Sequence, residues 1–566
     1  MSDSPPTMLT GGTVITMDPA RPRVEAVAVS GGTVLAVGAL SEVARRAGST
    51  AKVVDLGGGC LLPGFIDPHH HLFLVAADRW SCRPHGRPPR SISELLEEIR
   101  RVASADDGSG WLRVHGYQPL ALAERRSPTA AELDSVCPER PLHVLGLTYH
   151  ESSLNSAGLA RLGWGRRSPD PPGGRIVRDR RGRPTGVLVE SANFLAEAAS
   201  REAVLAGDAS EEWIARAERH SLALAQAGIT RIGDAAVPPV GMALYEQAAA
   251  AGRLAITVHR FPVGAGAISE PATLAAPTGT GDPRIPIGPA KLLADGGERC
   301  DLCLSVRQVL SSVSSTLRAT VHHGRLAATV ANRGGWARRG RDGHYHTGIR
   351  VLADDHLRHA TLAAADRGLQ VAIHAIGNGA VAGSADALHG ARGALAGLSG
   401  RPRLEHAMVL DPPLAHRIAD IGALVVTQPV FLHDLGDELT VLPLPSPLRL
   451  LALRTLLDAG VTVAASSDFP AGSFDPLVGI RAAVTRRLPD GSVVGPTESI
   501  SIEEALRCYT TSAADALGMA GRAGVISEGA AADLVVLSGD PLATDPDRLE
   551  DLRVVQTWVD GRQVVG

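Results

Sequence analysis

Residues 354–378 read DDHLRHATLAAADRGLQVAIHAIGN, and this stretch holds a helical pattern followed by a strand pattern. Residues 354–368 are rich in Ala, Leu and Arg and end in Gly368, a residue suited to terminate a helix. Residues 369–375 form an apolar run of strand length that carries His374 near its end. A helix that leads into a buried strand is the repeating unit of a parallel sheet, so the stretch predicts an α/β fold.

The same alternation recurs along the middle of the chain. Further helical patterns occupy residues 91–103, 211–228 and 449–460. Further strand patterns are LHVLGL (142–147), ITRIGD (229–234), PAKLLAD (289–295), RLEHAMV (403–409), ALVVTQ (423–428) and VTVAASSD (461–468). So many βα units in one region favour a closed (β/α)8 TIM barrel over an open sheet. In such a barrel the chemistry lies at the carboxyl ends of the strands.

The two ends of the chain differ from this middle. Residues 1–60 and 519–566 contain alternating apolar segments between Gly and Asp turns, which predicts β-strands. We expect one small composite β-sandwich domain built from both termini, and a barrel over residues 61–518. Residues 76–190 are too long for one βα unit and predict an inserted subdomain. Residues 300–347, rich in Arg, Ser and Gly, are either a lid over the active site or a solvated surface loop.

Composition and charge exclude several classes of protein. The chain has 566 residues and a formal net charge of −4, which gives no reason to expect nucleic acid or an anionic membrane as partner. No run approaches the roughly 18 apolar residues of a membrane span, and the N-terminus lacks the layout of a secretion signal. Six cysteines are too few for a disulfide framework and predict a cytoplasmic protein, and the pair Cys300 and Cys303 alone is a weak metal signal. We expect a small-molecule substrate as partner, and a homodimer stays open.

Residues with metal-ligand chemistry stand where five of the strands end. The segment Leu61–Phe73, LLPGFIDPHHHLF, ends in three consecutive histidines. Side chains alternate along a strand, so His69 and His71 share one face and His70 points to the other. If the shared face lines the barrel interior, the imidazoles of His69 and His71 can reach a common metal ion. If the strand faces the other way, only His70 points inward. The other four strands carry Lys291, His374, His406 and Asp468.

Lysine is so scarce in this chain that Lys291 is informative. Of the 56 basic residues only Lys52 and Lys291 are lysine. A lysine carboxylated by CO2 becomes a ligand that can bridge two divalent ions, and arginine cannot replace it because its guanidinium stays protonated. The alternative is a lysine whose ammonium reaches solvent at a strand edge.

The array His69-x-His71, Lys291, His374, His406, Asp468 resembles the amidohydrolase superfamily, and within it the subgroup of YtcJ-like proteins and N-substituted formamide deformylases. The sequence motifs that carry the resemblance occur here in the same order as in the family. They are GGTVITMD, LPGFIDPHHHL, ELDSVCPERPLHVLGLTYHESSLNSAGL, GRPTGVLVE, AGITRIGDA, KLLADG, VAIHAIGN, RLEHAMV, SSDFP and GVISEGAAADLVVLSGDPL. This sequence departs from the pattern at Asn378, where the family's HAIGD reads HAIGN, and in the basic insertion after KLLADG.

The resemblance implies a (β/α)8 barrel with a composite β-sandwich, one or two divalent ions, most often zinc, and hydrolysis of a carbon–nitrogen bond. It implies that His69, His71 and Asp468 hold one ion. It implies further that His374 and His406 hold a second and that carboxylated Lys291 bridges the two. A single ion held by three histidines and the aspartate is the alternative.

Amide hydrolysis requires a nucleophile at neutral pH, and metal coordination lowers the pKa of bound water from 15.7 to about 7. Asp468, at the last barrel strand, is placed to accept the water proton and pass it to the leaving nitrogen, so we expect it to be the general acid and base. The expected substrate is a small N-acyl, N-formyl or cyclic amide. Two alternatives are a heterocycle deaminase on the same fold and a non-catalytic scaffold, although a scaffold would be free to lose Lys291.

Substrate contacts are expected from two regions. His150 and Asn155 lie in TYHESSLN, which matches a sequence motif of the family, and we expect both residues to line the pocket. His344 and His346 lie in the basic insertion together with His322, His323 and the arginines Arg338, Arg339 and Arg341. These residues either contact an acidic substrate or are solvated.

Overall fold

Eight short strands with largely buried side chains form the centre of the molecule. The computed structural model describes residues 5–83, 87–106, 108, 110–206, 209–264, 276–323, 337–340, 342–441 and 444–566. The eight strands are β8 (Phe65–His70), β15 (Ile229–Val237), β16 (Thr257–Pro262), β17 (Ala290–Leu293), β21 (Val371–Ala375), β22 (Arg403–His406), β24 (Leu424–Thr427) and β26 (Val463–Ala465). Such continuous apolar runs are typical of parallel strands that are covered on both faces.

These strands form two parallel sheets whose neighbours follow chain order. One sheet has the order β16-β15-β8 and the other β17-β21-β22-β24-β26. β16 also contacts β17, and β26 contacts β8, where the amide of Asp468 donates to the carbonyl of His69 over 2.9 Å. Within the described residues no strand ladder joins the two sheets. The prediction of an α/β fold with parallel strands is therefore confirmed.

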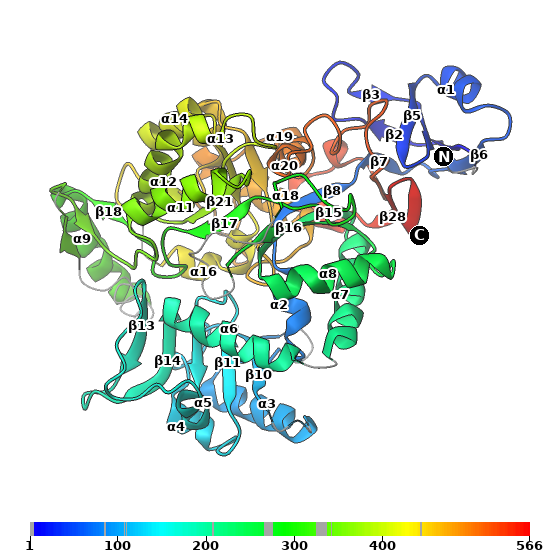
Figure 1. Cartoon of the computed structure of the whole chain (residues 1–566). Helices are drawn as coiled ribbons and strands as arrows, with labels where there is room; N and C mark the ends of the chain where they lie inside the picture. Colours follow the sequence, from blue (N-terminus) through cyan, green and yellow to red (C-terminus); the bar gives the residue numbers. More distant parts are fainter. Residues whose placement is uncertain are drawn as a thin grey trace.

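Helices connect successive strands and cover their outer faces (Figure 1). They are α2 (Leu72–Ala77), α7 (Ala209–Gln226), α8 (Pro239–Ala250), α11 (Asp354–Ala365), α12 (Asn378–Gly390), α14 (Pro412–Ile421), α17 (Leu453–Asp458), α18 (Pro476–Thr485), α19 (Ile502–Cys508) and α20 (Thr511–Ala516). The helix expected over residues 354–368 is α11, and Gly368 follows it with the positive φ of 74° that glycine tolerates.

A separate six-stranded sheet lies within residues 76–190, where an insertion was expected. Its order is β13-β14-β12-β11-β10-β9, and it forms a lobe below the central strands in Figure 1. Its strands are β9 (Trp80–Ser81), β10 (Leu112–Tyr117), β11 (Leu142–Gly146), β12 (Glu151–Leu154), β13 (Gly174–Arg178) and β14 (Pro184–Glu190). Its helices are α3 (Ile92–Ala105), α4 (Ala130–Asp134), α5 (Ser156–Arg161) and α6 (Ser191–Leu205). The segment LHVLGL is therefore β11 of this lobe and not a strand of the two parallel sheets.

Strands from both ends of the chain meet in one sheet. β27 pairs antiparallel with β7, and the six-stranded sheet has the order β29-β28-β27-β7-β2-β3. A second sheet, β5-β4-β1-β6, shares with it a buried cluster that includes Leu9, Val27 and Trp558. The strands are β1 (Thr7–Thr10), β2 (Thr13–Ile15), β3 (Arg23–Val24), β4 (Ala26–Ser30), β5 (Thr33–Gly38), β6 (Lys52–Asp55), β7 (Cys60–Pro63), β27 (Leu534–Leu537), β28 (Val554–Val559) and β29 (Arg562–Val565). Both termini lie at this end of the molecule (Figure 1).

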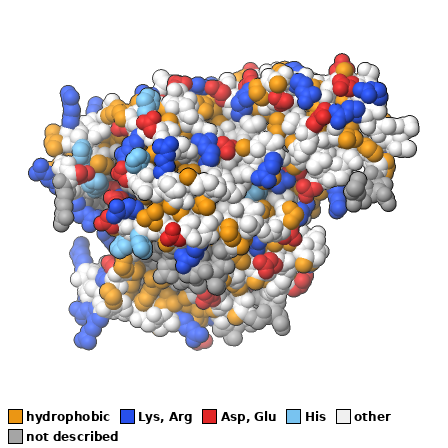
Figure 2. All heavy atoms as spheres, turned by 45° about the horizontal axis from the view of Figure 1, so that its top comes forward, with side chains coloured by type: hydrophobic (Ala, Val, Ile, Leu, Met, Phe, Trp, Pro, Cys, Tyr) orange, Lys and Arg blue, Asp and Glu red, His pale blue; other side chains and the backbone are white. Residues whose placement is uncertain are grey.

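The described part of the 300–347 insertion contains a small sheet and a projecting helix. The sheet has the order β18-β20-β19, with β18 (Cys303–Leu304), β19 (Arg338–Arg339) and β20 (Tyr345–His346), and the helix is α9 (Val306–His323). Residues 324–336 and 341 lie outside the described residues. On the face drawn in Figure 2, acidic and basic side chains are interspersed. None of the helices in the described ranges has the length and apolarity that crossing a membrane requires.

Candidate active site

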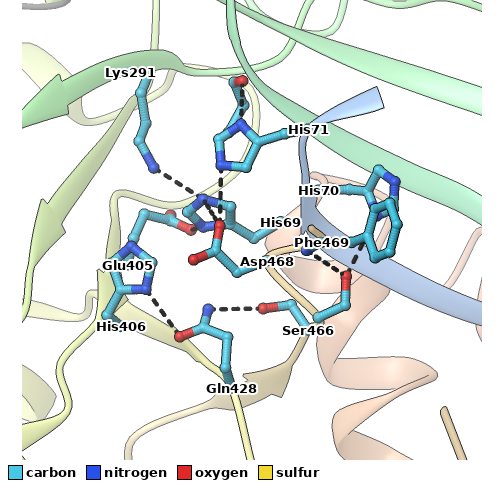
Figure 3. Close-up of polar contacts among 12 residues, drawn as sticks. His69, His70, His71, Lys291, Glu405, His406, Gln428, Ser466, Asp468 and Phe469 are labelled. Carbon is cyan, nitrogen blue, oxygen red and sulfur yellow. Dashed lines mark hydrogen bonds and ion pairs between the residues drawn. The ribbon is translucent and has the colours of Figure 1, made fainter. Parts of the chain in front are cut away.

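Three of the predicted metal ligands meet at the carboxyl ends of β8 and β26. Ligand atoms of His69, His71 and Asp468 all lie within 4.8 Å of one another. Asp468 Oδ1 is 3.0 Å from His71 Nε2 and 3.4 Å from His69 Nε2 (Figure 3). His69 lies on β8, whereas His71 precedes α2 and Asp468 lies in the loop after β26. Residues far apart in the chain thus come together because parallel strands end at one edge.

The other three predicted ligands lie beside this group. Lys291 Nζ is 3.1 Å from His69 Nε2. The ring centroid of His406 is 4.9 Å from that of His69 and 4.4 Å from that of His374. All six side chains line one pocket. The structure therefore brings together the whole set that the sequence singled out.

Three of the imidazoles are held in place through Nδ1. His69 Nδ1 contacts Glu405 Oε2 over 2.5 Å, His71 Nδ1 contacts the carbonyl of Ala235 over 2.9 Å, and His406 Nδ1 contacts Gln428 Oε1 over 2.9 Å. A carbonyl or carboxylate oxygen accepts a hydrogen bond, so in each ring Nδ1 carries the proton and Nε2 keeps its lone pair. This arrangement is the one that orients metal-bound histidines in proteins.

Glu405 is a supporting residue that the sequence reasoning missed. Arg403 Nε and Nη2 donate to its carboxylate over 2.5 and 2.9 Å, and both side chains are fully buried. Residues two apart on a strand share a face, so the pattern Arg-Leu-Glu of β22 places the pair side by side. Although burial favours the neutral acid, Arg403 and His69 hold the pKa of Glu405 well below its usual range. The signal available in the sequence was an Arg and a Glu two positions apart on a strand that ends in a predicted metal ligand, His406.

Burial keeps three imidazoles of the site, those of His69, His374 and His406, neutral. It lowers the pKa of His69 to about 3 and that of His406 to about 4. Burial and the neighbouring His406 also lower the pKa of His374 well below its usual value. His374 Nε2 is buried and has no hydrogen-bond partner among the described residues. An orphaned imidazole nitrogen costs free energy unless it coordinates something, so this donor set fits a divalent metal ion.

The two remaining groups differ in charge. Burial favours the neutral form of Asp468, but His69, His71 and His406 hold the pKa of its carboxyl well below the usual range. Burial lowers the pKa of Lys291 to about 8, although Glu405 and Asp468 act in the opposite direction. Asp468 is thus a carboxylate, whereas a fraction of Lys291 is a neutral amine near neutral pH.

His70 points away from this group (Figure 3). Its Nδ1 contacts Asp67 Oδ2 over 3.0 Å, its Nε2 contacts His220 Nε2 over 2.9 Å, and its ring stacks on Phe469 at 5.4 Å. Both ring nitrogens have protein partners, so His70 packs between β8 and α7. This is the side expected from strand alternation.

His150 enters the pocket from the inserted lobe. Its ring lies 5.1 Å from that of His374, and its Nδ1 contacts Glu190 Oε2 over 2.7 Å. Burial alone would lower the pKa of His150, but the Glu190 carboxylate outweighs it and raises the pKa to about 9. The imidazolium therefore donates from Nδ1 to Glu190, and the amide of Gly297 donates to Glu190 Oε1 over 3.2 Å. His150 supplies a cationic proton donor beside the metal-ligand set.

The other residues expected to contact substrate lie elsewhere. Asn155 is fully buried, where its Oδ1 accepts from the amides of Leu142 and Gly158 and its Nδ2 donates to the carbonyls of Cys137 and Arg140. It caps α5 and does not line the pocket, because all its polar capacity holds the lobe together.

The histidines of the insertion are also outside the pocket. His344 is half exposed beside Asp342, and His346 lines a second cavity with Cys303 and Asp342. The side chains of His322 and His323, and Arg341 as a whole, lie outside the described residues. The expected substrate contacts of His344 and His346 find no support in the described part of the insertion.

The rest of the pocket wall is partly apolar and partly charged. Leu74, Phe194 and Val263 provide apolar surface. Arg201 also lines it, paired with Glu197, and its Nε is buried without a hydrogen-bond partner in the described part of the chain. Phe194, Glu197 and Arg201 come from α6, whose sequence gave no signal that separates them from an ordinary helix.

Comparisons with known proteins identify the family of this chain. The model of the amidohydrolase family matches residues 52–565. An N-substituted formamide deformylase of Arthrobacter pascens is 31% identical over 560 residues, which cover 98% of this chain and 97% of the relative. The putative amidohydrolase YtcJ of Bacillus subtilis is 29% identical over 572 residues and 98% of each chain. Among solved structures, an uncharacterized metal-dependent hydrolase from Pyrococcus horikoshii has a TM-score of 0.68 at 20% identity, over 96% of this chain and 99% of that one.

Proposed function

The chain belongs to the amidohydrolase family, enzymes that hydrolyse carbon–nitrogen bonds other than peptide bonds, and we propose that its substrate is a small N-formyl, N-acyl or cyclic amide. The observation that carries the proposal is the convergence in one pocket of Asp468, Lys291 and three histidines whose Nδ1 atoms are held by protein oxygens. These groups supply both a metal-ligand set and a charged base within reach of one another.

His69, His71 and Asp468 would hold one divalent ion, and His374 and His406 a second. Neutral imidazoles and carboxylates suit zinc, and the site needs no cysteine. When bound, such an ion polarises a carbonyl and lowers the pKa of a water molecule from 15.7 to about 7. The absence of a hydrogen-bond partner at His374 Nε2 supports the second position.

Asp468 acts as the general base and then as the general acid. Its carboxylate is charged, lies 3.0 Å from His71 Nε2 and lines the pocket. It takes a proton from the attacking water, which adds to the amide carbonyl carbon. It then gives that proton to the nitrogen as the carbon–nitrogen bond breaks, which releases an acid and an amine.

Once carboxylated, Lys291 would supply a further ligand for the proposed ions. Its amine attacks CO2 only when it is neutral, and the burial that lowers its pKa to about 8 supplies that form. The reaction forms an N–C bond and releases one proton, which leaves a carbamate with two ligand oxygens. His69 and Asp468 adjoin this position.

His150 and the apolar wall define where the amide lies. The His150 imidazolium, held by Glu190, is placed to donate to an oxygen or nitrogen of the amide. Leu74, Phe194 and Val263 suit an apolar substituent on the nitrogen. The full-length similarity to an N-substituted formamide deformylase favours N-formyl amines among the amide classes.

We test this function by measuring formate and amine release from N-substituted formamides. Asp468→Asn is expected to lower kcat by about 10²–10⁴-fold while the bound metal is retained. Asp420→Asn, on the exposed side of α14, is the matched control and should leave kcat unchanged. A loss of only a fewfold in kcat for Asp468→Asn with metal retained would refute the role of Asp468.

Deamination of a heterocycle is the second candidate, since the same groups can direct water to a ring carbon. An adenosine deaminase from Xanthomonas campestris with bound zinc has a TM-score of 0.51 with this chain, at 16% identity, so the likeness concerns the fold alone. Ammonia release in place of formate would favour the deaminase. A chain free of metal and inert in both assays would favour a scaffold.

We also infer that the eight parallel strands close into a barrel and that the two terminal sheets form a β-sandwich. The contacts of β16 with β17 and of β26 with β8 support closure. The buried cluster shared by the terminal sheets supports the sandwich.

A further inference from the structure

Three ligand-type side chains meet in the insertion, away from the active-site pocket. Ligand atoms of Cys303, Asp342 and His346 all lie within 4.8 Å of one another. Cys303 on β18 stands directly opposite His346 on β20 in an antiparallel pair, and His346 Nε2 is 3.0 Å from Asp342 Oδ2. Ligands around a tetrahedral zinc ion lie about 3.3–3.8 Å apart, given metal–ligand bonds of about 2.0–2.3 Å. Small side-chain rotations therefore bring the three atoms onto one ion.

A buried carboxylate orients His346 toward the other two groups. Asp301 Oδ1 is 3.2 Å from His346 Nδ1, and the Asp301 side chain is 2% exposed. The carboxylate accepts the Nδ1 proton, so Nε2, which faces Asp342, is the nitrogen left to coordinate an ion once it gives up its proton. A carboxylate behind a histidine is the usual supporting partner of a zinc-bound imidazole. This is an observation independent of the clustering of the three ligand atoms.

The backbone around the cluster is firmly held. Asn378, at the start of α12, accepts from the amide of Cys303 through Oδ1 over 2.9 Å and donates to its carbonyl through Nδ2 over 2.8 Å. The amide of Asp301 donates to Asp295 Oδ2, and that of Thr347 donates to the carbonyl of Leu302. Two of the three ligands therefore sit on strands whose positions the central fold determines.

The cluster also has an open side. Cys303, Asp342 and His346 line an open cavity between the insertion and helices α12 and α14. The cavity gives an ion a path from solvent and leaves room for water as a further ligand. A thiolate combined with imidazole and carboxylate selects zinc over magnesium or calcium, which prefer oxygen ligands.

We propose that Cys303, Asp342 and His346 form a second metal site, specific for zinc, that cross-links the strands and the turn of the 300–347 insertion. A bound ion joins β18, β20 and the turn at Asp342, in addition to the strand pairing and the Asp342–His346 contact that already connect them. This site is separate from the proposed active site. It includes the thiol of Cys303, whereas the proposed active-site ligands include no cysteine. This proposal goes beyond the hydrolase function, and its test does not depend on that function.

The presence of one thiolate ligand gives the test a distinct signature. The full-length protein is stripped of metal, kept reduced and titrated with Co²⁺, whose thiolate complexes absorb by charge transfer in the near ultraviolet. The wild type is expected to show this band and Cys303→Ser to lack it. Cys300→Ser is the matched control, since Cys300 is the neighbouring cysteine but not among the three ligands, and should keep the band.

Zinc content gives a second readout that does not depend on activity. Cys303→Ser and Asp342→Asn are each expected to lose about one equivalent of zinc per chain relative to wild type, because three protein ligands fall to two. Circular dichroism and the Co²⁺ spectrum of the active site report whether each variant is folded. A reduced wild type without a thiolate band, or folded variants with unchanged zinc content, would overturn the proposal.

Discussion

Replacing Glu405 by glutamine should separate the role of its charge from that of its shape. Glu405 accepts from His69 and from two nitrogens of Arg403, and all three side chains are at most 1% exposed. Glutamine keeps one acceptor oxygen but turns an NH2 group toward donors. Removing one partner of a buried ion pair costs about 3–5 kcal/mol, since the remaining charge stays buried without compensation.

Two assays measure the consequences. Urea unfolding of the metal-free protein should give a lower free energy of unfolding for Glu405→Gln by about 3–5 kcal/mol. A zinc competition assay should give an affinity about 10–100-fold weaker, because His69 loses the acceptor that orients it. Glu503→Gln, which removes an exposed ion pair with Arg507, is the control and should change stability by less than about 1 kcal/mol. A Glu405→Gln protein with unchanged stability and metal affinity would refute the reasoning.

Three further changes test other parts of the site. Asn155→Ala should lower the free energy of unfolding by about 2–5 kcal/mol, because a helix cap and buried hydrogen bonds are lost. The KM of this variant should be unchanged. A changed KM at constant stability would show instead that Asn155 contacts the substrate. The His150–Glu190 pair raises the His150 pKa from 6.5 to about 9, so its stabilisation of about 3 kcal/mol is full below pH 6.5 and is lost as pH rises through 9. His150→Gln and wild type should therefore differ in urea midpoint at pH 6 and converge by pH 10; a constant difference would contradict the linkage. His71→Asn should release metal whereas His70→Asn should keep it, as metal analysis of both would show.

The sequence predicted the parallel strands because they are short apolar runs between helical patterns. It predicted one helix too long, over residues 449–460, where α17 begins only at Leu453. Arg449 and Leu450 pair instead with Val409 and Leu410 as a two-stranded sheet. A local apolar pattern does not distinguish a helix from a strand when the partner strand is 40 residues away.

Some residues of the site could likewise be predicted from local sequence, and others could not. His69, His71 and Asp468 could be identified because strand ends are marked by local pattern and because strand alternation fixes the side on which each residue lies. Glu405 and Glu190 could not, since their roles depend on which histidine lies opposite in the folded chain. Asn155 lies in a motif shared with the family for a structural reason, because both its side-chain oxygen and its side-chain nitrogen bind backbone groups of the lobe.

Asn378 connects the two unusual features of this sequence. An aspartate at this position, as in the family's usual word, could accept from the Cys303 amide but could not donate to the Cys303 carbonyl. The asparagine amide does both, over 2.9 and 2.8 Å, and so attaches β18 of the insertion to the residue four positions after His374. The departure at Asn378 and the unusual insertion are therefore in direct contact. Asn378→Asp should weaken zinc binding at Cys303 while leaving the Co²⁺ spectrum of the active site intact, and loss of both spectra together would show that the insertion and the active site are coupled.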